Sequence, residues 1–154
     1  MSEIYWSPGV LTQIENPHRV AFKKYWGWGL EIRQLADKAK GADNWFHIGI
    51  PCRSRTPFRS GTVIEKFILR AEVNENAKIK TIHLRDGRHL IVEKNVNFID
   101  TDVFAEFNPP TKFAWIAFGS NASGINLCVR VEFLTGEPLG TVTFLGAAVQ
   151  LDPQ

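Results

Sequence analysis

The sequence predicts an all-β protein: a single antiparallel β-sandwich, jelly-roll-like or immunoglobulin-like, with residues 1–154 forming one domain. Short runs of β-branched and aromatic residues alternate with Gly, Pro, Asn and Asp at the spacing expected of a sandwich. Several of these runs alternate apolar and polar residues, as strands do when only one face of an antiparallel sheet is buried. The chain has 154 residues, 44% of them hydrophobic and 22% charged, which is enough for one sizeable core.

The candidate strands share one pattern, a short apolar run bounded by turn-forming residues. They fall at residues 9–15, 19–23, 28–35, 44–50, 62–73, 78–85, 88–94, 102–107, 112–118, 125–134 and 140–151. In the segment EKFILRAEV, strand alternation directs Phe67, Leu69, Ala71 and Val73 into the core. At most one short helix is expected, over Arg33–Lys40 and ended by Gly41.

The stretch IKTIHLRDGRHLIVEK predicts a β-hairpin, because Asp86-Gly87 suits the two positive-φ positions of a type I′ turn. With these residues as the loop, Lys80 is expected opposite Glu93. The same register places His83 and His89 on opposite faces, so the two are not expected to share a metal ion. No metal or cofactor is predicted, because the sequence has no zinc-ligand spacing, P-loop or dinucleotide fingerprint.

Cys128 is expected on the more polar face of the strand GINLCVRVEFL, whose core residues are Ile125, Leu127, Val129, Val131 and Phe133. Arg130 on the same face could lower the pKa of the thiol and make it reactive. No base or second cysteine lies nearby in the sequence, so Cys128 is interpreted as a small structural residue. Cys52 and Cys128 are both expected to be free thiols.

Two strands, Trp45–Ile50 and Phe113–Phe118, carry apolar residues at both parities. Each should therefore be covered on both faces, and a partner surface is one candidate for the second cover. Within DNWFHIGIPCRSR, His47 and Cys52 have opposite parity, and Pro51 ends regular pairing between them. A metal site or catalytic pair formed by His47 and Cys52 is therefore not predicted.

The loop Pro51–Gly61 holds three arginines and no acidic residue. Arginine binds phosphate or carboxylate groups bidentately and pairs with acidic side chains of a neighbouring subunit. Together with the two-sided strands, this loop predicts an interface with Trp45, His47, Trp115, Arg53, Arg55 and Arg59 as its candidate residues.

The aromatic run YWGWG predicts a second kind of site. Trp26 and Trp28, separated by a glycine and preceded by Lys23 and Lys24, could form a stacking platform for sugar rings, with the lysines near anionic groups. The alternative is a strand bend whose tryptophans fill the end of the sandwich.

Charge and composition exclude some partners. The formal net charge of +2 lacks the single-sign excess typical of sequence-independent nucleic-acid binding. No stretch approaches the roughly 20 apolar residues of a membrane span. The acidic cluster Asp100, Asp102 and Glu106 lacks the glycine and the ligand count of a calcium loop.

The segment Trp45–Pro51, followed by the strand IEKFILRAEV and then by IKTIHLRDG, resembles the W-F-H-I-x-I-P and V-H-V-x-D-G pattern of a family of small bacterial β-sandwich proteins. The resemblance spans about residues 44 to 145. It implies a β-sandwich and brings no established activity, so it supplies no catalytic residues. Where the relatives follow the proline with Thr-Pro, this chain has Cys52-Arg53 and reaches Thr56-Pro57 later, within a longer and more basic loop.

The leading functional hypothesis is a soluble, non-catalytic interaction protein that assembles with copies of itself. The first alternative is a carbohydrate-binding, lectin-like module whose platform is Trp26 and Trp28. The second is a hydrolase that uses a Glu or Asp side chain together with His47. A glycan or an anionic ligand is a further candidate partner, and the expected location is the cytoplasm or export by a non-classical route.

Overall fold

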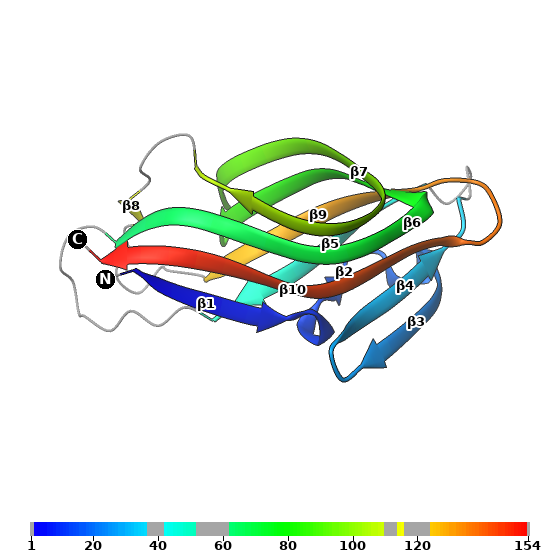
Figure 1. Ribbon diagram of the computed structural model, residues 1–154, viewed down its shortest axis with the longest axis horizontal. Helices are drawn as coiled ribbons and strands as arrows, with labels where there is room; N and C mark the ends of the chain where they lie inside the picture. Colours follow the sequence, from blue (N-terminus) through cyan, green and yellow to red (C-terminus); the bar gives the residue numbers. More distant parts are fainter. Residues whose placement is uncertain (1, 37–41, 52–61, 110–113, 116–123, 154) are drawn as a thin grey trace.

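The computed structural model describes residues 2–36, 42–51, 62–109, 114–115 and 124–153 (Figure 1). The strands within these ranges are β1 (Glu3–Pro8), β2 (Gln13–Ile14), β3 (Val20–Trp26), β4 (Gly29–Gln34), β5 (Asp43–Ile50), β6 (Thr62–Asp86), β7 (His89–Phe107), β8 (Ala114–Trp115), β9 (Ile125–Phe133) and β10 (Gly140–Pro153). Two short 3₁₀ turns, η1 (Gly9–Leu11) and η2 (Pro17–Arg19), lie on either side of β2.

The strands form one antiparallel sheet that curls into a β-sandwich, as the sequence predicts. The hydrogen-bonded order is β2-β5-β9-β6-β10-β4-β3, with β1 added to β10 and with β7 and β8 added to β6. β1 and β10 run side by side, so Glu3 pairs with Leu151 (Figure 1).

The long strand β6 joins the two layers by changing partners along its length. Residues Thr62–Val73 of β6 pair with β10, and residues Ala77–Asp86 pair with β9. β7 accompanies β6 on its other side across both halves. The first layer therefore comprises β2, β5, β9 and the second half of β6, and the second layer comprises β1, β3, β4, β10 and the first half of β6.

The core lies between these layers and follows the strand alternation. All five residues predicted as core in β9 are buried, as are Phe67, Leu69, Ala71 and Val73 in β6. Phe46 of β5 packs against Phe144 of β10, with 5.0 Å between ring centroids, and against Phe133 of β9 at 6.4 Å. Phe46 is fully buried and ties the first layer to the second.

The predicted hairpin is present, with a register that differs by one residue. Asp86 pairs with His89, so Gly87 and Arg88 form the turn, and of the two only Gly87 has a positive φ, 53°. A bulge between Leu84 and Arg85 then places His83 opposite Glu93. The expected pairing of Lys80 with Glu93 is therefore wrong, and Lys80 forms an ion pair with Glu132 instead.

Other elements also differ from the predictions. The helix expected over Arg33–Lys40 is not found where this segment is described: Arg33 and Gln34 belong to strand β4, and Leu35 and Ala36 have no regular structure. Residues 37–40 lie outside the described ranges. The break predicted at residues 74–77, between two candidate strands, is a bulge inside β6, and β7 is likewise one strand where two were predicted. β1 was not predicted. In the described ranges, no helix is both long and apolar enough to cross a membrane.

Candidate ligand-binding site

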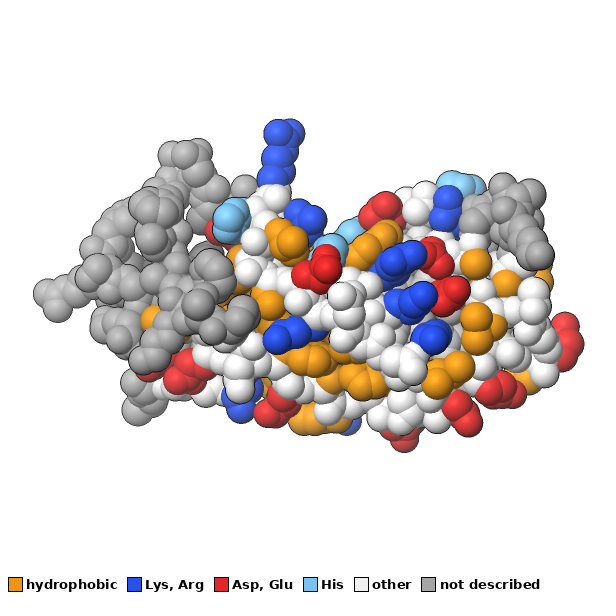
Figure 2. Space-filling model, turned by 90° about the horizontal axis from the view of Figure 1, so that it is seen from above, with side chains coloured by type: hydrophobic (Ala, Val, Ile, Leu, Met, Phe, Trp, Pro, Cys, Tyr) orange, Lys and Arg blue, Asp and Glu red, His pale blue; other side chains and the backbone are white. Residues whose placement is uncertain are grey.

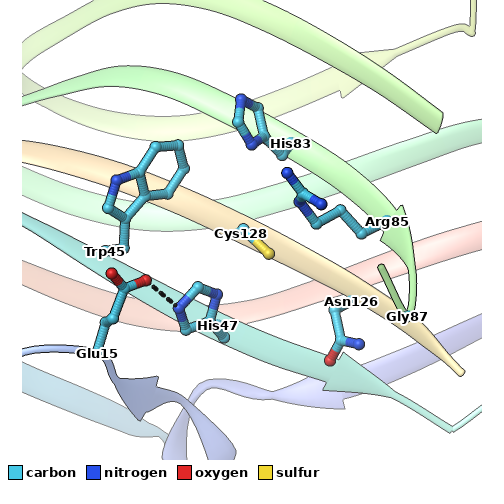
Figure 3. Close-up of a pocket in the computed structure, with 8 residues that line it drawn as sticks. All are labelled: Glu15, Trp45, His47, His83, Arg85, Gly87, Asn126 and Cys128. Carbon is cyan, nitrogen blue, oxygen red and sulfur yellow. Dashed lines mark hydrogen bonds and ion pairs between the residues drawn. The ribbon is translucent and has the colours of Figure 1, made fainter. Parts of the chain in front are cut away.

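A pocket of about 500 Å³ lies on the outer face of the first layer, over β5, β9 and β6 (Figure 3). Such a volume is within the range typical of small-molecule sites. Eight residues line it: Glu15, Trp45, His47, His83, Arg85, Gly87, Asn126 and Cys128. Strand alternation explains this lining, because Phe46 and Ile48 point into the core while Trp45 and His47 point to the opposite face.

Three side chains form a row across the floor of the pocket. Cys128 of β9 is the register partner of His47 in β5 and also of His83 in β6. Directly paired residues of neighbouring strands project to the same face, with Cβ atoms about 4.5–5.5 Å apart. The sheet therefore places a thiol between two imidazoles that lie 36 residues apart in the sequence.

Each imidazole is held by a carboxylate. His47 Nε2 lies 2.9 Å from Glu15 Oε2, and His83 Nε2 lies 2.7 Å from Glu93 Oε2. A carboxylate only accepts hydrogen bonds, so Nε2 is the donor in both pairs. In the neutral tautomer this leaves Nδ1 of each histidine as a hydrogen-bond acceptor for a ligand.

Glu15 reaches the pocket from the segment that follows β2. β2 pairs with β5, and the Glu15 backbone N–H donates to the Trp45 carbonyl at 3.0 Å. The next residue, Asn16, exchanges two hydrogen bonds with the Asn44 side chain, at 3.1 and 3.0 Å. Because Asn44 is buried, this amide pair holds the segment, and hence the Glu15 carboxylate, against β5.

Trp45 supplies the aromatic wall of the pocket. Its ring centroid lies 4.8 Å from that of His83, with an angle of 40° between the two planes. The indole is half-buried, so part of its surface remains available to a ligand.

Arg85 and Asn126 are register partners on the side of the pocket away from Trp45, and the Arg85 side chain extends from there toward His83 (Figure 3). Arg85 Nη1 donates to the Arg88 carbonyl oxygen at 3.1 Å. Among the described residues, no carboxylate pairs with Arg85. Asn126 Nδ2 has a long contact of 3.5 Å to the Gly124 carbonyl, so its amide retains hydrogen-bonding capacity.

Cys128 is a free thiol that is only 5% exposed. Burial raises its pKa to about 11, against a smaller lowering effect of the Arg85 guanidinium. The thiol is therefore protonated at neutral pH, which agrees with the structural interpretation. Arg130, the residue considered from the sequence as an activator, is instead bound to Asp43.

Metal binding is not supported by this arrangement. No group of three His, Cys, Asp or Glu side chains in the described part of the chain is placed to hold a metal ion. β9 lies between the strands that carry His47 and His83, so the backbones of the two histidines are about 9.5 Å apart. Each imidazole already binds a carboxylate through Nε2.

The predicted aromatic platform lies elsewhere, on the β3–β4 hairpin. Trp26 and Trp28 stack at 5.7 Å with planes 10° apart, and Trp28 is 55% exposed. Lys24 Nζ lies 3.6 Å from the Trp26 ring centroid, and Lys23 Nζ lies 5.9 Å from that of Tyr25. The tryptophans thus do not fill the end of the sandwich, and they do not line the pocket.

The predicted interface residues are only partly placed. Trp45 and His47 line the pocket, Trp115 lies in β8, and Arg53, Arg55 and Arg59 lie outside the described residues. Figure 2 shows hydrophobic side chains interspersed with basic and acidic ones over the face seen there. Self-association stays a prediction, and the native particle mass from light scattering at micromolar concentration tests it.

The acidic cluster is separate from His47. Asp100, Asp102 and Glu106 belong to β7 and do not line the pocket, and Glu106 forms an ion pair with Lys66 at 3.3 Å. The carboxylate that binds His47 is that of Glu15, and a hydrolase that uses a Glu or Asp side chain with His47 stays a prediction.

The fold and the pocket together define a β-sandwich with a polar and aromatic pocket on one outer face. No family model matches the chain, and no curated protein matches it. Among solved structures, the chain is similar to a family two carbohydrate esterase from Cellvibrio japonicus, with 12% identity, a TM-score of 0.49 and coverage of 99% of this chain and 36% of that one. The chain therefore spans about a third of that esterase.

Two further solved structures are similar to the chain over most of both lengths. One is a CBM4 protein, with 14% identity, a TM-score of 0.42 and coverage of 93% of this chain and 86% of that one. The other is TmCBM61 in complex with β-1,4-galactotriose, with 12% identity, a TM-score of 0.43 and coverage of 96% and 86%.

Proposed function

We propose that this protein is a carbohydrate-binding domain and that its glycan lies in the pocket over β5, β9 and β6. One observation carries the proposal: an indole and several polar side chains line a single open pocket of about 500 Å³. Sugar rings present an apolar face and a rim of hydroxyl groups, so an aromatic wall beside hydrogen-bonding groups suits them.

The polar groups match the chemistry of hydroxyl groups. The Nδ1 atoms of His47 and His83 and the Glu15 carboxylate can accept hydrogen bonds, whereas Arg85 can donate and the Asn126 amide can do both. The Glu15–His47 and Glu93–His83 pairs fix the two imidazoles before any ligand arrives. Such preorganisation lowers the entropic cost of binding.

The experiment is a titration with a panel of soluble oligosaccharides, followed by the indole N–H resonances of ¹⁵N-labelled protein. Binding in the pocket should shift the Trp45 resonance, and Trp45→Ala should weaken binding about 5- to 150-fold, if a sugar ring stacks as strongly as a nucleobase does, at about 1–3 kcal/mol. Trp28→Ala is the matched control, because it removes an exposed indole from the hairpin and leaves the pocket unchanged.

The two variants separate the candidate sites. If Trp28→Ala abolished binding and Trp45→Ala did not, the glycan would bind on the hairpin platform rather than in the pocket. If no glycan in a broad panel shifted any indole resonance, carbohydrate binding itself would be refuted.

A further inference from the structure

We propose that the glycan bound in this pocket is acidic, with Arg85 as the counter-ion of its anionic group. The proposal rests on the carbohydrate-binding function and specifies the class of ligand. The decisive observation is a guanidinium that lines a pocket without a carboxylate partner among the described residues.

Among the described residues, one hydrogen bond to the backbone holds the guanidinium. Arg85 Nη1 donates to the Arg88 carbonyl across the hairpin turn, at 3.1 Å. An arginine has five N–H donors, so most of its hydrogen-bonding capacity remains available. A guanidinium binds carboxylate or sulfate groups through two parallel hydrogen bonds, which a neutral hydroxyl cannot reproduce.

Two carboxylates near the pocket, those of Glu15 and Glu93, form ion pairs with histidines and not with Arg85. Glu15 lines the pocket beside Trp45 and binds His47, while Glu93 on β7 binds His83. Asp86 lies next to Arg85 in the chain and pairs with Ile125 and His89 in the sheet, so alternation directs its side chain to the face opposite that of Arg85. An anionic group of the ligand can therefore bind the Arg85 guanidinium without competition from a carboxylate among the described residues on the Arg85 side of the pocket.

The layout of the pocket also indicates the size of the ligand. Trp45 pairs with Arg130 of β9, and Arg85 pairs with Asn126, four residues further along the same strand toward its beginning. Four residues of a strand span about 13 Å. The proposal therefore places one ring on the indole and the acidic group of the same or a neighbouring sugar unit at Arg85 and Asn126.

The test compares acidic oligosaccharides with neutral forms of the same linkage. Uronate-containing fragments are paired with their carboxyl-reduced forms, and sulfated fragments with their desulfated forms, each titrated by calorimetry. At least one acidic fragment should bind ten to a hundred times more tightly than its neutral form. Sodium chloride should weaken that binding, because it screens charge pairs. The two kinds of pair show whether the anionic group is a carboxylate or a sulfate.

Arg85→Gln should reduce the affinity for the acidic fragment to that for its neutral form. Arg88→Gln is the matched control: it removes an exposed arginine from the same turn and retains the carbonyl that Arg85 uses. Equal binding of acidic and neutral forms, or equal effects of the two variants, would overturn the proposal while carbohydrate binding stands. Failure of every fragment, acidic or neutral, would refute the proposed function itself.

Discussion

The Trp45 indole packs against the His83 imidazole at 4.8 Å between ring centroids, although β9 separates the strands that carry them. The contact crosses one strand diagonally, because His83 pairs with Cys128 and Trp45 pairs with Arg130. It fixes the position of the aromatic wall relative to the floor of the pocket.

His83→Ala should shift the indole N–H resonance of Trp45 and increase its accessibility to acrylamide, because the imidazole covers part of the indole. His89→Ala is the control, since His89 is an exposed residue of the same hairpin and does not line the pocket. The measurement is the ¹⁵N–¹H correlation spectrum of the folded variants. An unchanged Trp45 resonance in His83→Ala would contradict the ring contact.

Phe46→Ala should lower the free energy of unfolding by about 3–5 kcal/mol, as large-to-small changes of buried aromatic residues do. Phe46 is fully buried and contacts Phe133 and Phe144, so the truncation removes a contact within one layer and one between layers. Ile4→Ala is the control, because Ile4 is 50% exposed and should cost far less. Urea denaturation measures both changes, and similar losses for the two variants would argue against Phe46 as a link between the layers.

Gly140→Ala should destabilise the fold by about 1–3 kcal/mol through overpacking. A Cβ atom at residue 140 would lie 2.3 Å from the Asn76 carbonyl oxygen and 3.0 Å from the Phe133 ring. That carbonyl accepts a hydrogen bond from the Leu134 N–H at 2.8 Å, so a shift away from the added Cβ would weaken this hydrogen bond. Gly27→Ala, which has no atom within 4 Å of its added Cβ, should leave the thermal midpoint nearly unchanged.

Alkaline pH should destabilise the protein through Cys128. Burial raises the thiol pKa from 9.0 to about 11, so below pH 9 both the folded and the unfolded states hold the proton. Between pH 9 and 11 only the unfolded state loses it, and stability falls with rising pH. The shift corresponds to about 2–3 kcal/mol.

The measurement is the free energy of unfolding of the wild type and of Cys128→Ala across this pH range. The wild type should lose stability relative to the variant as the pH rises from 9 to 11, and the difference should be constant at pH 7 to 8. Parallel curves throughout would show that the thiol does not titrate at the raised pKa.

The fold class was predictable because strand alternation reflects local geometry. In β9, the residues from Ile125 to Phe133 alternate in the sequence, and the apolar ones are buried as predicted. The continuity of β6 was not predictable from composition, because Asn74 usually favours a turn. Here its side chain accepts from the Thr141 N–H and donates to the Leu139 carbonyl, which stabilises a bulge inside a longer strand.

The site was harder to predict than the fold. The alternation of polar and apolar residues in β9 predicts that Cys128 lies on the outer face. The strand order and the register of the sheet then bring His47 and His83 to either side of it. Those registers depend on pairing between segments about 40 to 80 residues apart in sequence, which one sequence does not specify. Glu15 and Arg85 gave no signal of their own, since single charged residues near turns are common on any surface.

The continuity of β6 and β7 has a consequence for how the chain folds. Paired residues of this hairpin are close in sequence, from 3 residues apart at Asp86 and His89 (89 − 86) to 40 apart at Phe67 and Phe107 (107 − 67). By contrast, Glu3 of β1 and its partner Leu151 of β10 are 148 residues apart (151 − 3). Short separations close faster than long ones, because loop closure costs less entropy. We therefore expect the β6–β7 hairpin to form early. β9 and β10 should then pair with the two halves of β6, and β1 should pair with β10 last.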